Sequence, residues 1–466
     1  MTDSLFRRLD AVRPRDVLLA IAALTGVRIL ALILTQVELG PDEAQYWRWS
    51  RELDWGYYSK PPLIAWTIAL TTALFGNDEW AIRLASPIAH GFGAFALYLL
   101  ARRMAGPERR PGATGALAAA IYFLMPGVWL SSSIISTDAL LLPLWSGALL
   151  FLWRLRERPG LRDAALFGAL LGLATLAKYA GLYFLLGAAI AAAFDAPTRR
   201  ALLSTAGAVA LLAFALVLAP NLIWNAANSF ATVSHTADNT DWEAAALNLD
   251  NVPTFLVDQM AVFGPVAFLA LLAGLALRLR RRQDETAAPT LWLAAFILPP
   301  LLIILGQAIA ARAHANWAAS AYPAASVLLA LWAGDPRWRR WIAGGVLLNA
   351  AVGLVFLVLV VLPPPAWDRL GASNAFKRVR GWEETAAQLA DIARRTDATA
   401  ILTDEREVWH GLDYYGRGLD MPPVRAWRLL DEAHNFAEQA GALQPGEDAR
   451  VLVASIRDHY RPRIRG

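Results

Sequence analysis

The chain has 466 residues, of which 57% are hydrophobic and 18% are charged, and its net charge is +4. Soluble globular proteins carry about 25% charged residues, so this composition is typical of a protein that crosses a membrane many times. The chain has no cysteine, which excludes thiolate nucleophiles, cysteine-ligated zinc and iron–sulfur clusters. Its 32 glycines follow no triplet period, which excludes a collagen-like protein.

Long apolar runs predict the membrane helices. A helix needs about 20 mostly apolar residues to cross a bilayer, because its backbone polar groups must be satisfied inside the lipid. We expect about eleven spans, near residues 17–37, 79–101, 113–131, 138–153, 163–177, 180–195, 201–222, 254–277, 289–310, 318–334 and 341–363. The first run has no small-residue cleavage site, so we expect a retained anchor. A further stretch, 61–76, starts with Pro61-Pro62 and is interpreted as an interfacial helix.

The distribution of Lys and Arg predicts the orientation. One set of loops holds 21 positive residues between Arg7 and Arg340, whereas the opposite loops hold six. Cytoplasmic loops of membrane proteins are enriched in Lys and Arg. The asymmetry therefore predicts a cytoplasmic N-terminus, and after an odd number of spans the C-terminal segment faces the other side.

Residues 364–466 differ in composition from residues 1–363, because charged residues return after Pro363-Pro364-Pro365. We expect a membrane domain over 1–363 and a small α/β domain over 364–466, since about 100 residues suffice for one. The pattern predicts helices at 382–395, 405–415 and 431–440, and strands at 398–403, 424–427 and 450–455. Asp404, Glu405 and His410 are interpreted as structural.

The first external loop, residues 38–62, concentrates polar and aromatic groups. Pro41 predicts a helix start, and Asp42 and Glu43 then lie in the first turn, where the helix dipole favours carboxylates. Lys60 is held by the two prolines that follow it. Five aromatic residues have the chemistry to stack on sugar rings: Trp47, Trp49, Trp55, Tyr57 and Tyr58. An alternative is a plain charge pair beside an interfacial aromatic belt, although ionisable residues at a membrane edge are functional candidates.

Five short motifs carry a resemblance to a known superfamily. They are Asp42-Glu43-x-x-Tyr46 with Lys60-Pro61-Pro62, Ser136-Thr137-Asp138, Lys178-Tyr179, Asn221-Leu222-Ile223-Trp224-Asn225, and His314-Ala315-Asn316-Trp317. In this order, and all on the predicted external face, they resemble the GT-C membrane glycosyltransferases of bacteria. The most similar families are the aminoarabinose transferase (ArnT-like), the protein O-mannosyltransferase-like and the rhizobial galacturonosyltransferase-like enzymes.

The resemblance implies a GT-C fold, a polyprenyl-phosphate-linked sugar as donor, and transfer on the periplasmic face of the inner membrane to an envelope lipid or glycan. Lys60 and Lys178 are then candidates to bind the donor phosphate. Asp42 is the candidate general base for an inverting transfer. Asp138 would orient the acceptor or anchor the base, and Glu43 would hold Lys60 or a sugar hydroxyl. Simpler interpretations remain open, namely a snorkelling Lys178 and a helix-capping Asp138.

Further candidates to bind the sugar or the acceptor are spread over several loops: Tyr46, Tyr57, Tyr58, His235, His314 and Asn316. His235 belongs to an acidic loop, 223–252, that lacks Lys and Arg. One histidine with spaced carboxylates is weak support for a metal, so no cofactor is assigned and a divalent cation stays possible.

One residue departs from the resemblance. Relatives of the aminoarabinose type often carry Arg where this chain has Gln45, which removes one expected phosphate contact. Within the superfamily, a protein O-mannosyltransferase is the alternative. A transporter or lipid flippase is the alternative from another class, but transporters place ionisable groups at the membrane midplane, whereas here they concentrate in the external loops.

Overall fold

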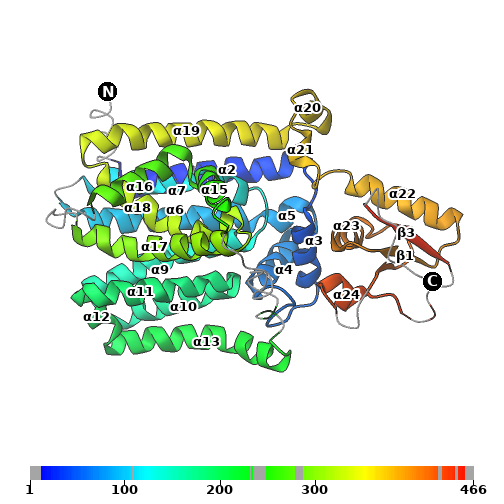
Figure 1. Ribbon diagram of the computed structural model, residues 1–466, viewed down its shortest axis with the longest axis horizontal. Coiled ribbons are helices and arrows are strands. Elements are labelled where there is room, and N and C mark those ends of the chain that lie inside the picture. The colour runs from blue at the N-terminus through cyan, green and yellow to red at the C-terminus, as the bar shows by residue number, and fades with distance from the viewer. Residues whose placement is uncertain are drawn as a thin grey trace.

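The structure is a computed structural model that describes residues 12–107, 110–230, 232, 234, 248–278, 287–428, 433–444, 446 and 450–456. A helical bundle holds most of the chain, and a small α/β unit lies at one end of it (Figure 1). The bundle helices up to residue 227 are α2 (Pro14–Leu34), α3 (Pro41–Ser50), α4 (Leu63–Phe75), α5 (Glu79–Arg83), α6 (Ala85–Ala105), α7 (Pro111–Phe123), α8 (Pro126–Ser131), α9 (Thr137–Glu157), α10 (Leu161–Ala177), η2 (Tyr179–Leu182), α11 (Tyr183–Phe194), α12 (Ala196–Leu202) and α13 (Thr205–Ala227).

The second part of the bundle and its connection to the α/β unit are again helical. The elements are α15 (Asn251–Phe263), α16 (Pro265–Arg278), α17 (Ala287–Ala310), η4 (Ala315–Ala321), α18 (Tyr322–Trp332), α19 (Pro336–Val361), α20 (Pro364–Arg369) and α21 (Ser373–Phe376). Proline stands in the first turn of many of these helices, where its missing N–H costs no hydrogen bond.

Six described helical stretches are long and apolar enough to cross a membrane: α2, α5 with α6, α9, α13, α17 and α19. A seventh arises if α15 and α16 count as one broken span. The helix α9 is 21 residues long, longer than the expected run 138–153. The run 113–131 divides into α7 and α8 ahead of Pro126. The expected total of about eleven spans stays a prediction.

The run 254–277, expected as one span, is formed by the two helices α15 and α16. The two helices meet at an angle of 113°. The chain turns at Gly264, whose φ of +96° is a backbone conformation that residues with a Cβ rarely adopt. Asn349 of α19 donates from Nδ2 to the carbonyl oxygen of Phe263 over 3.1 Å. This contact satisfies a backbone group that the break removes from the helix, as burial in a membrane protein requires.

The C-terminal unit contains three parallel strands in the order β2-β1-β3. Its elements are α22 (Trp382–Arg395), β1 (Ala400–Thr403), α23 (Arg406–Tyr415), β2 (Val424–Ala426), α24 (Phe436–Gly441) and β3 (Val451–Ala454). The expected α/β pattern is therefore confirmed, with α22 at its predicted bounds. The predicted helix at 431–440 starts too early. The helix begins at Phe436 because Asn435 caps it, accepting from the backbone N–H of Glu438 over 3.1 Å.

Within the bundle, the short helices α3, α4 and α5 lie at the end that faces the C-terminal unit (Figure 1). Aromatic rings join the two parts, since Trp47 of α3 meets Tyr414 of α23 edge-on at 4.9 Å between centroids. The hydroxyl of Tyr415 accepts from the backbone N–H of Leu39 over 2.6 Å. Buried hydrophobic residues of the bundle and of the C-terminal unit form one continuous cluster. The interface between them is thus part of the protein core.

Candidate active site

A cavity of about 510 Å³ lies where the segment 38–62 meets the C-terminal unit. The residues that line it come from α3, from the loops before α4 and α9, from the segments around Lys178 and η4, and from α23 and the start of α24. They are Asp42, Gln45, Tyr46, Tyr58, Ser59, Lys60, Ile134, Ser136, Thr137, Asp138, Lys178, His314, Asn316, Trp317, Arg406, His434, Asn435 and Phe436. Four of the five sequence motifs therefore contribute to one cavity, and the motif Asn221–Asn225 does not line it.

Asp42 lies in the first turn of α3, as expected from Gly40-Pro41. Its side chain is 61% exposed and lines the cavity. The carboxylate accepts from the guanidinium of Arg406, with Oδ1 3.1 Å from Nη2. An ion pair between such exposed groups is weak, so the carboxylate is available to exchange partners.

Asp138 faces the cavity from the first turn of α9. The residue that caps this helix is Ser136, which accepts from the N–H of Ala139 over 3.3 Å. The capping alternative for Asp138 is therefore wrong. Its carboxylate instead accepts from the ammonium of Lys178 at 2.9 and 3.1 Å and from the side-chain amide of Asn316. Lys178 consequently points into the protein, and the snorkelling alternative is wrong as well.

Lys60 is the least committed cation of the cavity. Within the described part of the chain its ammonium makes neither a hydrogen bond nor an ion pair, while it lines the cavity. Burial lowers its pKa, and the neighbouring charge of Lys178 lowers it further, whereas Asp42 and Asp138 raise it. A partly desolvated cation without a protein partner is suited to bind an anion.

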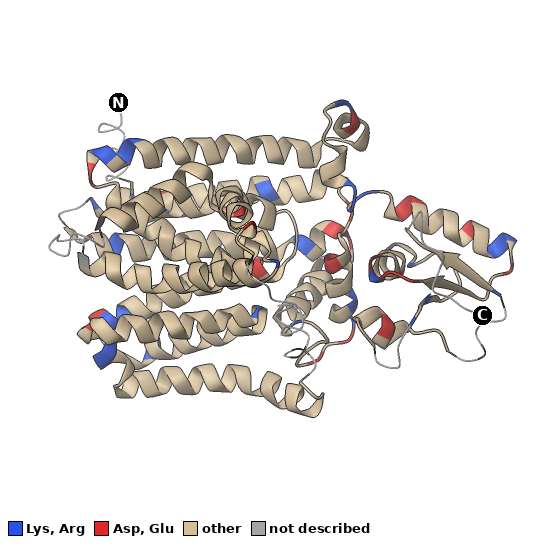
Figure 2. Cartoon of the chain, viewed as in Figure 1, with Lys and Arg blue, Asp and Glu red and all other residues tan. Residues whose placement is uncertain are grey.

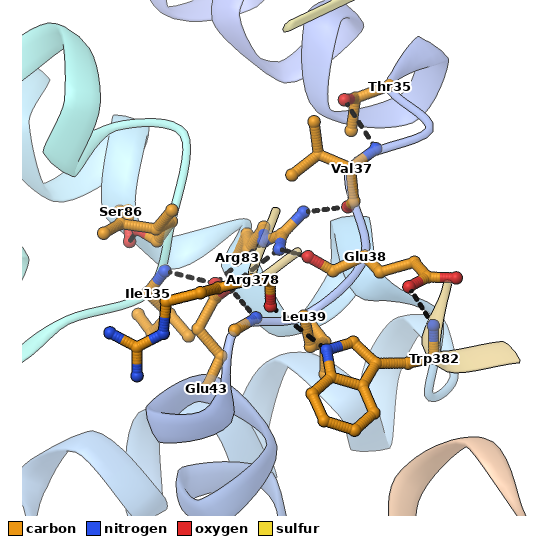
Figure 3. Close-up of polar contacts among 12 residues, drawn as sticks. Thr35, Val37, Glu38, Leu39, Glu43, Arg83, Ser86, Ile135, Arg378 and Trp382 are labelled. Atoms are coloured by element: carbon orange, nitrogen blue, oxygen red, sulfur yellow. Dashed lines mark hydrogen bonds and ion pairs between the residues drawn. The ribbon is translucent and has the colours of Figure 1, made fainter. Parts of the chain in front are cut away.

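Glu43 does not hold Lys60 or line the cavity, contrary to expectation. Figure 3 shows its side chain turned toward Arg83 and the segment at Ile135. Its carboxylate accepts from Arg83 at 2.7 and 2.8 Å, from the N–H of Gly40 at 2.9 Å and from the N–H of Ile135 at 2.9 Å. Glu43 is thus a buried structural contact between the start of α3 and the loop that leads to Asp138.

Most aromatic residues of the first loop pack in the interior instead of facing a ligand. Tyr57 is buried, stacks on Trp49 at 4.8 Å and bonds its hydroxyl to backbone groups of the same loop. Its expected contact with sugar is therefore wrong, and Trp47 and Trp49 are likewise buried. Tyr46 and Tyr58 do line the cavity. Desolvation raises the pKa of the Tyr46 hydroxyl well above its ordinary value, so it remains a hydrogen-bond donor.

His314 and Asn316 reach the cavity from the segment that begins η4. His235 lies outside the described residues. Among the described residues, no three His, Asp or Glu side chains converge as a metal site would require. The motif Asn221–Asn225 has a supporting role, because the side chain of Asn221 donates to the carbonyl oxygen of Trp55 over 2.6 Å. It fixes the far end of the first loop.

Two arginines were missed by the sequence analysis. Arg83 is 0% exposed and was counted only as a positive charge in an external loop. Arg406 follows Asp404 and Glu405, which were interpreted as structural, and no role was predicted for it. It donates from Nη1 to Gln45 over 3.0 Å, the residue that departs from the resemblance. A lone arginine among apolar residues was the available signal for Arg83, but no local pattern pointed to Arg406.

Over residues 59–224 the chain matches the family model described as dolichyl-phosphate-mannose-protein mannosyltransferase. It is 36% identical to the lipid A galacturonosyltransferase RgtD of Rhizobium johnstonii, over 86% of this chain and 82% of the relative. The chain belongs to the family of this galacturonosyltransferase. It is therefore a glycosyltransferase of the GT-C superfamily.

More distant relatives share the fold. The chain is 27% identical to an undecaprenyl phosphate-alpha-4-amino-4-deoxy-L-arabinose arabinosyl transferase of Aeromonas salmonicida, over 78% of this chain and 70% of the relative. The crystal structure of ArnT from Cupriavidus metallidurans bound to undecaprenyl phosphate superposes with a TM-score of 0.62 at 18% identity, covering 94% of this chain and 89% of that one. The expected GT-C fold is confirmed.

Proposed function

We propose that this glycosyltransferase moves a galacturonic acid residue from a polyprenyl-phosphate donor to a lipid A-type acceptor of the cell envelope. The sugar and the acceptor follow from the name of the relative that is 36% identical over most of both chains. The lipid phosphate follows from the names of the arabinosyl transferases and of the ArnT complex. The supporting observation in this chain is one cavity that holds Asp42 beside Lys60 and Lys178.

The proposed reaction is a single displacement. A hydroxyl oxygen of the acceptor attacks C1 of the sugar and Asp42 accepts the hydroxyl proton, for which Arg406 must release the carboxylate. The bond between C1 and the phosphate oxygen breaks, and its electrons leave with the polyprenyl phosphate. Lys60, with Lys178 near it, stabilises that anion. Because the attack and the departure occur on opposite faces of C1, the configuration inverts.

We further propose that the cavity lies on the periplasmic side of the inner membrane. Lys and Arg gather at the end of the bundle that is remote from the C-terminal unit (Figure 2), which includes the last turns of α6 and α9. Under the positive-inside rule this end is cytoplasmic. The C-terminal unit and the cavity then face the compartment in which lipid A-type acceptors are modified.

The base is tested with Asp42→Asn in proteoliposomes. This substitution keeps the shape of the side chain but removes the proton acceptor. We expect transfer from polyprenyl-phosphate galacturonate to lipid A to fall about hundred- to ten-thousandfold. Glu52→Gln is the matched control, because Glu52 lies in the same loop and its carboxylate pairs with Arg48 at the surface. Near-normal turnover by the Asp42→Asn enzyme would exclude Asp42 as the base.

The phosphate site is tested with Lys60→Ala. Loss of a charge-assisted contact to the donor phosphate should raise the apparent KM for the donor about tenfold or more. Lys377→Ala serves as the control, since Lys377 is exposed and lies outside the cavity. A donor KM equal to that of the wild type would show that another cation holds the phosphate.

A further inference from the structure

The C-terminal unit presents the carboxyl edge of its small parallel sheet to the cavity. Arg406 follows the end of β1 by three residues and begins α23, and the segment 434–436 follows β2 in the chain. Both line the cavity. In open α/β sheets, ligands bind outside the carboxyl ends of the strands. The position of Arg406 is therefore one at which such a sheet commonly contacts a ligand.

In the proposed reaction, one cation of the cavity is left without an anionic partner. Its described lining carries two carboxylates, Asp42 and Asp138, and three cations, Lys60, Lys178 and Arg406. Asp138 already holds Lys178 at 2.9 Å, and a donor phosphate occupies Lys60 in the proposed reaction. When Asp42 acts as the base, its ion pair with Arg406 breaks. A second negative group on the donor would then pair with the guanidinium of Arg406.

The geometry of Arg406 suits a carboxylate. Its two terminal nitrogens point to different residues of the cavity, Nη1 to Gln45 at 3.0 Å and Nη2 to Asp42 at 3.1 Å. A guanidinium presents such parallel donors as a fork that matches the two oxygens of one carboxylate. The side chain is 39% exposed, so it is accessible from the cavity and its pair with Asp42 exchanges easily.

We infer that Arg406 binds the carboxylate of the transferred uronic acid and thereby selects it over the neutral hexose. This inference rests on the proposed function, because it names how the same site recognises its sugar. The contact with Asp42 links selection to catalysis. A sugar carboxylate that draws Arg406 away also frees the base, whereas a neutral hexose leaves Asp42 paired.

The experiment compares two donors on the full-length enzyme in proteoliposomes. They carry the same polyprenyl phosphate and differ only at C6 of the sugar, which is a carboxylate in galacturonate and a hydroxymethyl group in galactose. The wild type should prefer the uronate. Arg406→Gln should lower kcat/KM for the uronate about ten- to hundredfold. It should leave kcat/KM for the galactosyl donor unchanged or raise it, because Asp42 then no longer pairs with Arg406. Arg406→Lys, which keeps the charge but not the fork, should give an intermediate loss.

Two controls separate the outcomes. Arg378→Gln removes an arginine that lies outside the cavity and pairs with Glu407, the neighbour of Arg406 in α23. This substitution should leave kcat/KM for both donors unchanged. Lys60→Ala should raise the apparent KM for both donors by the same factor. If Arg406→Gln affects both donors equally, or raises the KM for lipid A instead, Arg406 does not read the sugar and the inference fails while the proposed function stands. If the wild type transfers no uronate at all, the proposed function itself fails.

Discussion

Arg83 and Glu43 form a buried ion pair that connects three segments near the cavity. Besides their mutual contact, Arg83 donates to the carbonyl oxygens of Val37 and Glu38 at 2.8 Å each. Glu43 also accepts from the N–H of Ile135 (Figure 3). The pair thus holds the start of α3, which carries Asp42, next to the loop that precedes Asp138. It positions both carboxylates without lining the cavity.

Removal of one partner should be costly at this site. The side chains of Arg83 and Glu43 are 0% and 6% exposed, and Glu43→Ala leaves the guanidinium buried without its counter-ion. Such a change costs about 3–5 kcal/mol, so we expect a lower midpoint of thermal unfolding in detergent together with reduced transfer. Glu52→Ala, which breaks an exposed pair with Arg48, should cost at most about 1 kcal/mol. Equal melting of the two variants would contradict this role.

At the scale of elements, close approach of α10 and α13 depends on glycine. A Cβ at Gly168 would lie 2.0 Å from the carbonyl oxygen of Ala210, and one at Gly172 would lie 2.8 Å from the side chain of Val217. Small residues that let backbones touch are a common basis of helix packing in membranes, where lipid is as apolar as the helices. The two helices end near Lys178 and the motif at Asn221, so their spacing bears on the cavity.

Gly168→Ala should therefore destabilise the bundle. In an open helix this change stabilises by up to about 1 kcal/mol, but here the added methyl group collides with a backbone atom and the helices must separate. We expect a lower unfolding midpoint than for the wild type. Gly306→Ala is the matched control, because Gly306 lies inside α17 and the added carbon would meet no atom of another element within 4 Å. A midpoint for Gly168→Ala as high as that of this control would be inconsistent with tight packing.

The whole molecule has one basic end and one end that carries the cavity and the C-terminal unit (Figure 2). The chain has no cysteine, so one introduced thiol reports its own location. Thr396→Cys, at an exposed position after α22, should react with a membrane-impermeant maleimide added to spheroplasts. Arg158→Cys, exposed at the end of α9 in a basic loop, should react only after lysis. The reverse pattern would invert the proposed topology and place the cavity in the cytoplasm.

Much of the candidate site followed from local sequence. Gly40-Pro41 is a helix-start signal, so Asp42 was expected in the first turn of a helix, where the structure places it. Long apolar runs marked the helices, since lipid permits few other structures. The short strands and α22 followed from periodicity, and the motifs placed Lys60, Asp138 and Lys178 together by resemblance. These are properties of short segments, which a sequence displays directly.

Contacts between distant segments decided the rest. Glu43 and Asp42 are adjacent carboxylates with the same local preference, and only Arg83, 40 residues away, assigns one to the interior and leaves the other at the cavity. Arg406 reaches Asp42 across 364 residues, which no local spacing encodes. Tyr57 was predicted to bind sugar but packs in the core, because Trp49 stacks on its ring. Composition and apolar runs determined that this chain is a multi-helix membrane protein, and the motifs indicated an enzyme by resemblance. Which charges remain uncompensated depends on desolvation and pairing, and those exist only in the folded state.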